Sequence, residues 1–510
     1  MRILLVQPPE GSAFGVSKVF LPEPLGLELV AAALTPDRHE LRLIDMRLER
    51  WSVLERELRD FRPDAVGVAC AFTSEVIRVR EIAQVVRAVR PQAFLFLGGH
   101  DATRTPTHFG PEHADAIVMG EGEWTAPRLL RAVEGNQRLD DIPGLSVMTD
   151  QGPLRNEGTP DYQEMDLLPV PRRDLVERYR MRYFIGFQRP VYSMETTRGC
   201  PYTCNFCSVW EMYERTYRGK SPPAVLEDLA RCPGDEIFFT DDLFFLDAKR
   251  ALALADAIRA SGIKKRYTAQ IRADSVAKHP EIVEAWRSIG LQRTFIGMEA
   301  TDDEGLAKVE KKAHIDSTEK AIRLLADAGV EIQGSFIVHP DWGREDFQKL
   351  AQFVRERPIT YASFSILTPL PGTKLHRERL SEITNHDPEL MDVFHAVLPT
   401  VLPLEDFYRE FANLYRATYP VKRWPEMIAG AFDMWKKKDF LHMARVVSSL
   451  ANLARPRSYW IAHKSADRRA RRYGPARPAP IVSETHKRTA AERLLSLQGR
   501  KAAPAAAPAN

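Results

Sequence analysis

The chain has 510 residues, 44% of them hydrophobic and 28% charged, which is ordinary for a soluble globular protein of two or three domains. Its formal net charge of +3 is close to neutral, so bulk charge indicates no nucleic-acid partner. Five cysteines do not make a disulfide framework in a chain of this length, and neither a signal-like N-terminus nor a long apolar run is present, so we expect a cytoplasmic protein without a membrane span.

The first part of the chain alternates strand-like and helical stretches. The strands have few charges, which is typical of a doubly wound parallel α/β sheet covered on both faces. We therefore expect a Rossmann-like domain over residues 1–140. Strands are expected at 2–6, 40–45, 65–72, 93–99 and from Ala114, and helices at 25–34, 52–61, 74–90 and from Trp124.

Ligands of such sheets bind at the carboxyl ends of the strands, where glycines let a large ligand approach the backbone. The candidate binding residues at these ends are Thr73, Ser74, Gly98, Gly99, His100, Gly120, Glu121 and Gly122. The alternative is that the glycines only form tight turns, and the sequence of this region leaves both readings open.

The rest of the chain divides into four segments. Scattered prolines over 141–190 indicate an ordered linker, and six further strand-like runs over 191–380 predict a partial (β/α)6 barrel. Residues 381–460 are expected to form a helical C-terminal region. Residues 461–510 are basic and then rich in Pro and Ala, so we expect a disordered tail. The six barrel strands are expected at 191–196, 236–240, 266–271, 293–299, 331–338 and 361–367.

Three cysteines, Cys200, Cys204 and Cys207, fall within the stretch "TTRGCPYTCNFCSVW", in the loop after the first barrel strand. Structural zinc takes four closed ligands, usually as two pairs, and no second pair is present here. A 4Fe–4S cube held by three cysteines leaves one iron open to a small molecule, so the spacing favours such a cluster over zinc.

The spacing Cys-x3-Cys-x2-Cys, with Phe206 before the last cysteine, resembles the radical S-adenosylmethionine (SAM) superfamily. Further matches are "FFTDDLF", "IRAD", "IGMEATDDEGLAKVEKK" and "TPLPGTKL", which follow later barrel strands. The whole pattern, over residues 1 to about 420, resembles the class in which a cobalamin-binding domain precedes the radical SAM barrel. That resemblance implies three cofactors: a 4Fe–4S cluster, SAM and cobalamin.

The resemblance also implies roles for individual residues. The three cysteines are the cluster ligands, and SAM chelates the open iron before it is cleaved to a 5′-deoxyadenosyl radical. The implied SAM-binding residues are Phe206, Asp241, Asp242, Arg272 and Glu299, and the implied cobalamin-binding residues are the eight candidates on the N-terminal sheet. A structural alternative for the four charged residues is a salt-bridge layer at the barrel rim.

One departure from the family concerns the cobalt ligand. Many cobalamin proteins carry Asp-x-His-x-x-Gly after the first strand, but the corresponding loop here, "QPPEGSAFGVSKVF", has no histidine. Either the cobalt lacks a lower ligand from that loop or cobalamin does not bind. His100 is a candidate substitute, although a histidine after two glycines at this strand end commonly serves backbone packing.

The commonest reaction of the class is methylation of an unactivated carbon, and no catalytic acid–base pair is assigned. The stretches "FLPEPLGLELVAAAL" and "FIVHPDWGREDF" resemble hopanoid methylases, especially the C-3 methylase. We therefore expect a small-molecule or lipid substrate and an external electron donor of the flavodoxin or ferredoxin type.

Three alternatives stay open. One is a radical SAM cyclase or ring-modifying enzyme, such as a tetrapyrrole cyclase, and another is a non-enzymatic iron–sulfur or cobalamin sensor. The third concerns residues 424–460, whose apolar stretches alternate with basic residues. They suit either a helix at the inner face of a membrane or a core helix with a solvated basic face, and the second reading is favoured.

Overall fold

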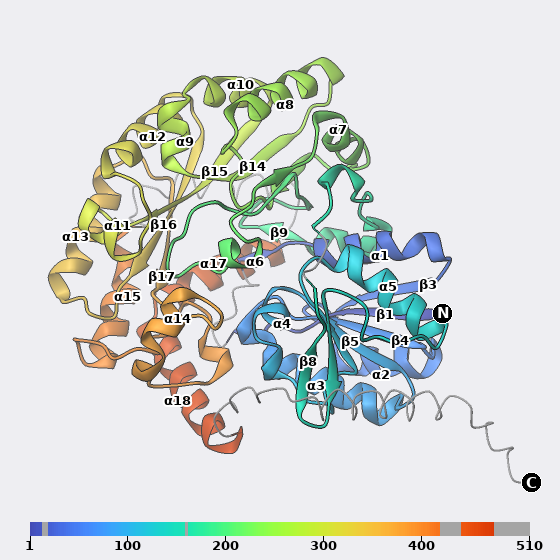
Figure 1. Ribbon diagram of the computed structural model, residues 1–510. Helices are drawn as coiled ribbons and strands as arrows, with labels where there is room; N and C mark the ends of the chain where they lie inside the picture. The colour runs from blue at the N-terminus through green and yellow to red at the C-terminus, as the bar shows by residue number, and fades with distance from the viewer. Residues whose placement is uncertain (13–18, 159–161, 419–439, 474–510) are drawn as a thin grey trace, which may run out of the picture.

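A computed structural model describes residues 1–12, 19–158, 162–418 and 440–473 (Figure 1). Two sheets dominate it, a seven-stranded sheet in the N-terminal part and a six-stranded sheet in the middle of the chain. The elements of the first part are β1 (Arg2–Gln7), α1 (Leu25–Leu34), β3 (Glu40–Asp45), α2 (Trp51–Asp60), β4 (Ala65–Ala69), α3 (Val76–Val89), β5 (Phe94–Gly98), α4 (His100–Arg104), β6 (Ala116–Val118), α5 (Gly122–Glu134), β7 (Leu145–Thr149) and β8 (Gly152–Arg155).

The N-terminal sheet has the order β3-β1-β4-β5-β6-β7-β8, and its first five strands are parallel. Successive side chains of a strand point to opposite faces. Accordingly Ile3 and Leu5 of β1 pack into one apolar cluster, and Leu4 and Val6 pack into another on the other face. Both faces are therefore buried, and the expected doubly wound domain is confirmed. Strand order reverses between β1 and β4, where such sheets bind their ligands.

The second sheet is parallel throughout, in the order β10-β13-β14-β15-β16-β17. All six strands expected for the barrel are present. They are β10 (Val191–Met194), β13 (Glu236–Phe239), β14 (Arg266–Ile271), β15 (Leu291–Glu299), β16 (Glu331–Val338) and β17 (Tyr361–Ile366). The helices between them are α7 (Pro222–Ala230), α8 (Ala248–Ser261), α9 (Ala273–Lys278), α10 (Glu281–Ile289), α11 (Asp303–Lys308), α12 (Ile315–Asp327) and α13 (Arg344–Glu356), with α14 (Lys374–Arg379) after the last strand.

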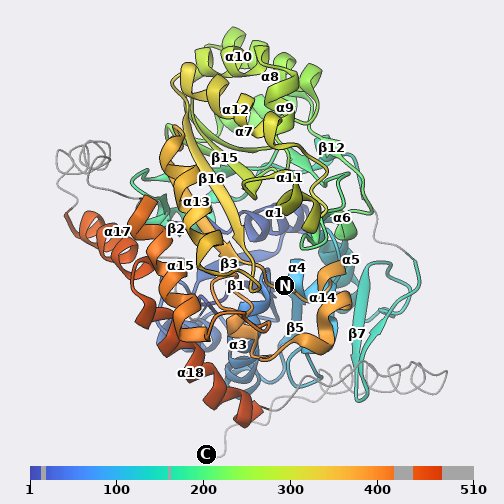
Figure 2. The same ribbon diagram turned by 90° about the vertical axis from the view of Figure 1, so that its left-hand side faces the viewer.

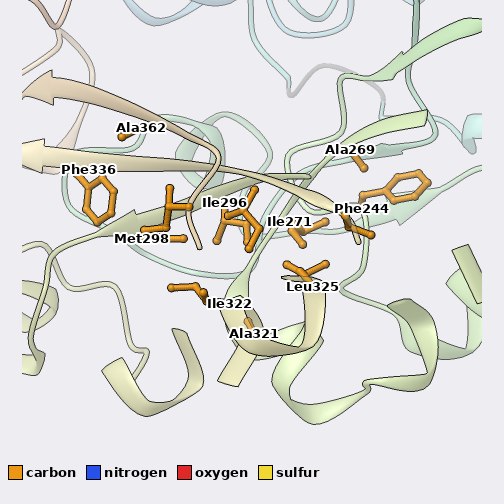
Figure 3. Close-up of a cluster of buried hydrophobic side chains, with 14 of the residues drawn as sticks. Phe244, Ala269, Ile271, Ile296, Met298, Ala321, Ile322, Leu325, Phe336 and Ala362 are labelled. Carbon is orange, nitrogen blue, oxygen red and sulfur yellow. The ribbon is translucent and has the colours of Figure 1, made fainter. Parts of the chain in front are cut away.

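The core of the barrel lies between its strands and the outer helices. Figure 3 shows Ile296 and Met298 of β15 facing Ile322 and Leu325 of α12, and all four side chains are buried. This packing holds the strands in register, so that the loops at their carboxyl ends start from a rigid base.

The C-terminal region is helical, with α15 (Leu404–Thr418), α17 (Phe440–Leu453) and α18 (Pro456–Tyr473). The expected start of a disordered tail at residue 461 is wrong, because α18 continues to Tyr473. Tyr459 of this helix is fully buried and stacks on Tyr408 of α15 with ring centroids 5.7 Å apart. Residues 474–510 lie outside the described residues, and so do residues 424–439 of the segment 424–460 considered above as a membrane-surface helix. Among the described helices, none has the length and apolarity needed to cross a bilayer.

The segment expected to be a linker, 141–190, is partly built into the two domains. Strands β7 and β8 extend the N-terminal sheet as an antiparallel edge. Further along, β9 (Phe184–Ile185) pairs with β2 (Phe20–Leu21), which precedes α1. The expected domain boundary at residue 140 therefore falls inside the first sheet.

Buried charges join this segment to both domains. Glu23, before α1, pairs with Arg180 and accepts a 2.6 Å hydrogen bond from the backbone N–H of Ser193 in β10. Arg173 donates a 2.6 Å hydrogen bond to Asp228 of α7 and another to the carbonyl of Ser193. Each of these charged side chains is at most 7% exposed, so the contacts between the two domains include a desolvated ionic cluster.

Candidate active site

The cysteine loop is closed at its base by a short pair of strands. After β10 the chain enters β11 (Thr197–Arg198), which pairs antiparallel with β12 (Arg218–Gly219), so the residues between them form one closed loop. Gly199, directly after β11, has φ +90°, and a Cβ there would lie 2.3 Å from the carbonyl oxygen of Thr216. A glycine is therefore required where the loop starts, one residue before Cys200.

We expect Gly199→Ala to distort this loop and to lower the iron and sulfide bound per chain by about half or more, since the Cβ both strains the backbone and meets a carbonyl. Gly262→Ala is the matched control, because Gly262 also has positive φ (+71°) but no atom within 4 Å of its Cβ position. Chemical iron and sulfide analysis of both reconstituted variants decides the point. Equal cluster content in the two variants would contradict the close-contact argument.

The three thiols of the loop lie near enough to one another to affect each other's ionisation. Burial raises the pKa of Cys200 to about 11 and that of Cys207 to about 12, and in both cases the neighbouring Cys204 raises it further. The carboxylate of Asp242 also raises both values. Three soft sulfur donors on a single loop, near enough to affect one another's ionisation, fit a thiolate-bound iron–sulfur cluster, whose positive irons would favour the deprotonated form.

The other two cysteines lie elsewhere. Cys70 is buried at the end of β4, and Cys232 is buried after α7, where its pKa responds to Arg173 and Asp228. Within the described ranges, no three His, Cys, Asp or Glu side chains are grouped so as to hold a single metal ion. This includes the three thiols of the loop, which are not gathered around one metal position; a four-iron cube, in which each cysteine binds a different iron, does not require that they be.

The two aspartates after β13 have different surroundings. Asp241 is fully buried and accepts hydrogen bonds from the hydroxyls of Thr196 and Thr197, both 2.6 Å long, and from the Thr196 N–H. Asp242 is accessible to solvent, yet protein atoms surround it closely enough that burial is the largest cause of the rise of its pKa to about 7. Asp242 therefore reaches solvent near two of the thiols, whose pKa values it raises, whereas Asp241 fixes the base of the cysteine loop.

A group of buried charges lies at the carboxyl ends of β14 and β15. The guanidinium of Arg272 stacks 3.7 Å from the ring centroid of Tyr202 and donates to Asp274. Lys311 Nζ lies 2.6 Å from Glu299 Oε1, and Glu299 has φ +64°, a conformation that non-glycine residues adopt rarely. Burial raises the pKa of Cys204 above its ordinary value, and both cations act against that rise. A site with positive charge beside the thiols can hold an anionic group of a ligand.

Phe206 occupies a different environment from the charged candidates. It is partly buried against an apolar cluster that includes Val309, Ile337 and Leu367. The neighbouring Asn205 donates from its N–H to the carbonyl of Val309. These contacts attach the middle of the cysteine loop to strand β16 and to the residues that follow α11 and β17.

The candidate cobalamin residues surround the carboxyl ends of β4, β5 and β6. Thr73 donates to Asp101 over 2.5 Å, and Gly99 needs to be glycine because a Cβ would lie 2.7 Å from the Cys70 carbonyl oxygen. Phe72, directly after β4, is 66% exposed, which is unusual for an aromatic side chain at a ligand-binding edge of a sheet. A large flat ligand could cover this ring.

Glu75, in the same loop, provides a test of the local electrostatics. It is buried, accepts hydrogen bonds from the N–H groups of Ala71 and Phe72, and burial raises its pKa from 4.5 to about 7. Between these values the folded chain holds a proton that the unfolded chain releases. Stability is therefore lost as the pH rises through this window, by on the order of 3 kcal/mol.

We expect Glu75→Gln to remove this pH dependence, because glutamine keeps the acceptor oxygen and cannot ionise. Urea unfolding midpoints at about pH 5 and about pH 8 measure the change. The control is Glu55→Gln on α2, which removes an exposed carboxylate paired with Arg59. A Glu75→Gln variant that kept the full slope would contradict the assignment.

His100 turns toward the cysteine loop. Its Nε2 lies 2.5 Å from the hydroxyl of Ser208, which follows Cys207, and burial lowers the pKa of the imidazole to about 4. The imidazole is therefore neutral and in contact with the barrel domain. Arg104, at the end of the same short helix, pairs with Glu211 of the loop and donates to the carbonyl of Gly372.

A second ionic group connects the loop to the glycine turn after β6. The guanidinium of Arg198, 5% exposed, contacts Glu123 at 2.6 Å, Glu195 at 2.7 Å and Glu121 at 3.2 Å. Arg218 of β12 also pairs with Glu121. Glu121, expected at the cobalamin site, thus contacts the base of the cysteine loop, and the two candidate cofactor sites are held against each other.

The two sheets and the thiol loop between them define a radical SAM enzyme that carries an N-terminal cobalamin-binding domain. Residues 13–130 match the B12 binding domain family, and residues 194–354 match the radical SAM superfamily. Two solved structures share the fold. OxsB with aqua-cobalamin has a TM-score of 0.66 at 16% identity, covering 97% of this chain and 84% of that one, and TsrM from Kitasatospora setae, with cobalamin and a [4Fe-4S] cluster, has 0.62 at 19%, covering 79% and 83%.

Two curated relatives extend over most of the chain. It is 35% identical to the hopanoid C-3 methylase of Methylococcus capsulatus, over 82% of this chain and 80% of that protein. It is 31% identical to an uncharacterized methyltransferase of Pyrococcus horikoshii, over 74% and 82%. The chain belongs to the cobalamin-dependent radical SAM methyltransferases, with a 4Fe–4S cluster, SAM and cobalamin as cofactors.

The structure adds residues that sequence reasoning did not select. Tyr202, Asp274 and Lys311 join Arg272 and Glu299 beside the thiols. Lys311 lies within the quoted "VEKK" stretch, but a lysine next to another lysine gives no signal that one of them is buried. Phe72 and Arg198 were also missed, since exposure and salt-bridge partners across domains cannot be read from sequence.

Proposed function

We propose that this methyltransferase acts on an unactivated carbon of a hopanoid, at the C-3 position. The observation that carries the proposal is the 35% identity to a hopanoid C-3 methylase over most of both chains. The sequence stretches that resemble hopanoid methylases support the same substrate class. The chain's other relatives include a magnesium-protoporphyrin IX monomethyl ester cyclase of Cereibacter sphaeroides, but at 25% identity over 72% of this chain, which is weaker support for the ring-forming alternative.

Cys200, Cys204 and Cys207 are the proposed cluster ligands. When bound, the cluster, SAM and cobalamin together supply the methyl group and the radical chemistry. Asp242, whose carboxylate raises the pKa of Cys200 and Cys207, is the proposed partner of the SAM ammonium. Asp241 holds Thr196 and Thr197 in place, which supports the loop from below.

The buried cations beside Cys204 are the proposed partners of the SAM carboxylate. Arg272 is oriented by Asp274 and by the ring of Tyr202, and Lys311 is oriented by Glu299. These partners fix both cations before a ligand arrives, which reduces the cost of ordering them on binding. Phe206 is proposed to place its ring at the edge of this pocket, where its apolar contacts restrict its motion.

The proposed cobalamin site is the carboxyl edge of the N-terminal sheet. Phe72, Thr73 and Ser74 lie after β4, and the glycine turns at 98–100 and 120–122 lie after β5 and β6. The loop after β1 contains no histidine, and His100 is bonded to Ser208. We infer that neither place supplies a histidine to the cobalt.

Several expectations complete the proposal. We assign residues 1–158 to the cobalamin domain, 191–380 to the barrel and 381–473 to the helical region, with 162–190 as a buried connection. The electron donor is proposed to be of the flavodoxin or ferredoxin type. The enzyme is proposed to work in the cytoplasm, at the inner face of the membrane that contains its lipid substrate.

An anaerobic assay tests the function. Reconstituted protein is incubated with cobalamin, reductant, methyl-deuterated SAM and a hopanoid extract, and mass spectrometry follows 5′-deoxyadenosine and lipids that gain a labelled methyl group. Both products are expected. Deoxyadenosine without labelled lipid would overturn the hopanoid substrate, and deoxyadenosine with a newly cyclised tetrapyrrole would favour the ring-forming alternative. Neither product, from protein with a verified cluster, would revive the sensor.

A further inference from the structure

One exposed stripe of α17 has no charged side chain at its described positions, and the exposed Arg445 lies beside it. The stripe consists of Phe440, Ala444, Val447, Ser448 and Ala451, which recur at helical spacing and are all exposed. Phe440 is 48% exposed and Val447 49%. Surface helices of soluble proteins normally present polar or charged residues on this side, so an uncharged face with two large apolar side chains indicates a binding surface.

The opposite face of α17 is anchored, which fixes the apolar face outward. His442, Val446, Ser449 and Leu453 are buried. The His442 ring lies 4.4 Å from that of Phe184, and its Nε2 lies 3.2 Å from a backbone carbonyl oxygen of the connecting segment. Figure 2 shows α17 and α18 along the outer edge of the molecule.

The charge of this region is strongly one-sided. Residues 440–473 contain eight Lys or Arg residues and a single acidic residue, Asp467. Arg455, Arg457 and Lys464 are exposed. Ile461, which lies among these residues on α18, is 51% exposed. An apolar helix face accompanied by a cluster of basic residues is complementary to a surface with an apolar interior and anionic groups at its boundary.

We propose that the α17 face, together with the exposed Arg455, Arg457 and Lys464, docks this enzyme on an anionic lipid bilayer. Phe440 and Val447 enter the boundary between headgroups and acyl chains, and the arginines contact lipid phosphates. A second copy of this chain is a poorer occupant, because it would bring two strongly basic segments together. This docking surface adds a membrane partner to the proposed function. It rests on that function only for the identity of the lipid that the docked enzyme takes up as its substrate.

The test is co-sedimentation of the full-length, cluster-reconstituted protein with sucrose-loaded vesicles. Wild-type protein is expected to bind phosphatidylglycerol vesicles at least about tenfold more tightly than phosphatidylcholine vesicles, and to be released by high salt. Phe440→Asp/Val447→Asp is expected to bind at least about tenfold more weakly. The matched control is Leu167→Asp/Leu380→Asp, which adds the same charge at two side chains that are 60% and 50% exposed.

Binding of the control variant like wild type, with loss in the α17 variant, supports the α17 face as the contact. No preference of the wild type for phosphatidylglycerol, or equal loss in both variants, overturns the proposal. So does light scattering that shows a wild-type dimer converted to a monomer by the α17 substitutions without any vesicle binding. Methylation of hopanoid delivered in cyclodextrin is measured in parallel. If wild-type protein binds vesicles but does not methylate the hopanoid, the proposed substrate is contradicted and the docking surface is still supported.

Discussion

Replacing Cys204 with alanine is expected to abolish cluster binding and with it the reductive cleavage of SAM. Cys204 is 8% exposed, and its thiol interacts electrostatically with the other two thiols and with the buried cations Arg272 and Lys311. With two thiols left, the loop has too few ligands to retain a four-iron cube with one open iron. Iron and sulfide content, the absorbance of the reconstituted protein and 5′-deoxyadenosine formation measure the loss. Cys200→Ala and Cys207→Ala are expected to behave in the same way.

Cys232→Ala is the control for these variants. Cys232 is 1% exposed, so the substitution removes a buried sulfur from the core, but the residue lies after α7, away from the loop. We expect it to lower stability by about 1 kcal/mol and to leave the iron content unchanged. If Cys232→Ala lost its iron as completely as Cys204→Ala, the three-cysteine assignment would be wrong.

Arg198→Met is expected to destabilise the protein by about 3–5 kcal/mol, the usual cost of leaving buried charges without their partner. The substitution leaves Glu121, Glu123 and Glu195 facing one another, where they repel. It also weakens the attachment of the glycine turn after β6 to the base of the cysteine loop, where the pair of Arg218 with Glu121 remains. SAM cleavage needs only the barrel, whereas methyl transfer needs both domains in position. We therefore expect the ratio of methylated product to 5′-deoxyadenosine to fall in addition to the melting temperature.

Arg259→Met is the matched control, because Arg259 forms an exposed pair with Asp256 on α8. Exposed ion pairs contribute at most about 1 kcal/mol, and this one lies outside the contacts between the domains. The product ratio of the control should equal that of wild type. An unchanged ratio in Arg198→Met, at a temperature where the variant is folded, would show that the ionic group stabilises the fold without setting the position of the two sites.

The sequence predicted the parallel strands well because these strands are buried on both faces. Runs such as "RILLV" and "EIFF" contain few charges, which is typical of strands covered on both faces. The strands β7 and β8 were missed because an antiparallel edge has a weaker pattern and is preceded here by Pro143 and Gly144. Helix α18 was missed in part because its arginines suggested disorder, whereas Tyr459 binds it to α15.

Some residues of the candidate site could likewise be predicted from the sequence, and others could not. The spacing of three cysteines specifies a chemistry by itself, so these residues were readable from the sequence. The difference between Asp241 and Asp242 was not, since it depends on which carboxylate meets the two threonine hydroxyls. Likewise the sequence offered His100 as a substitute cobalt ligand, but its hydrogen bond to Ser208 connects residues 108 positions apart.

The pairing of β2 with β9 and the ionic cluster around Glu23 limit where the chain can be divided into separately expressed domains. Residues 20–23 contact residues 180–193, so the contacts between the domains include segments that lie more than 150 positions apart in the chain. Expressing residues 1–140 alone would remove the edge strands β7 and β8 and leave Glu23 without its arginine. The cobalamin domain therefore cannot be separated from the connecting segment at residue 140 without losing these contacts. Exchange with a relative would have to move the connecting segment together with the domain, because the two have to change as one unit.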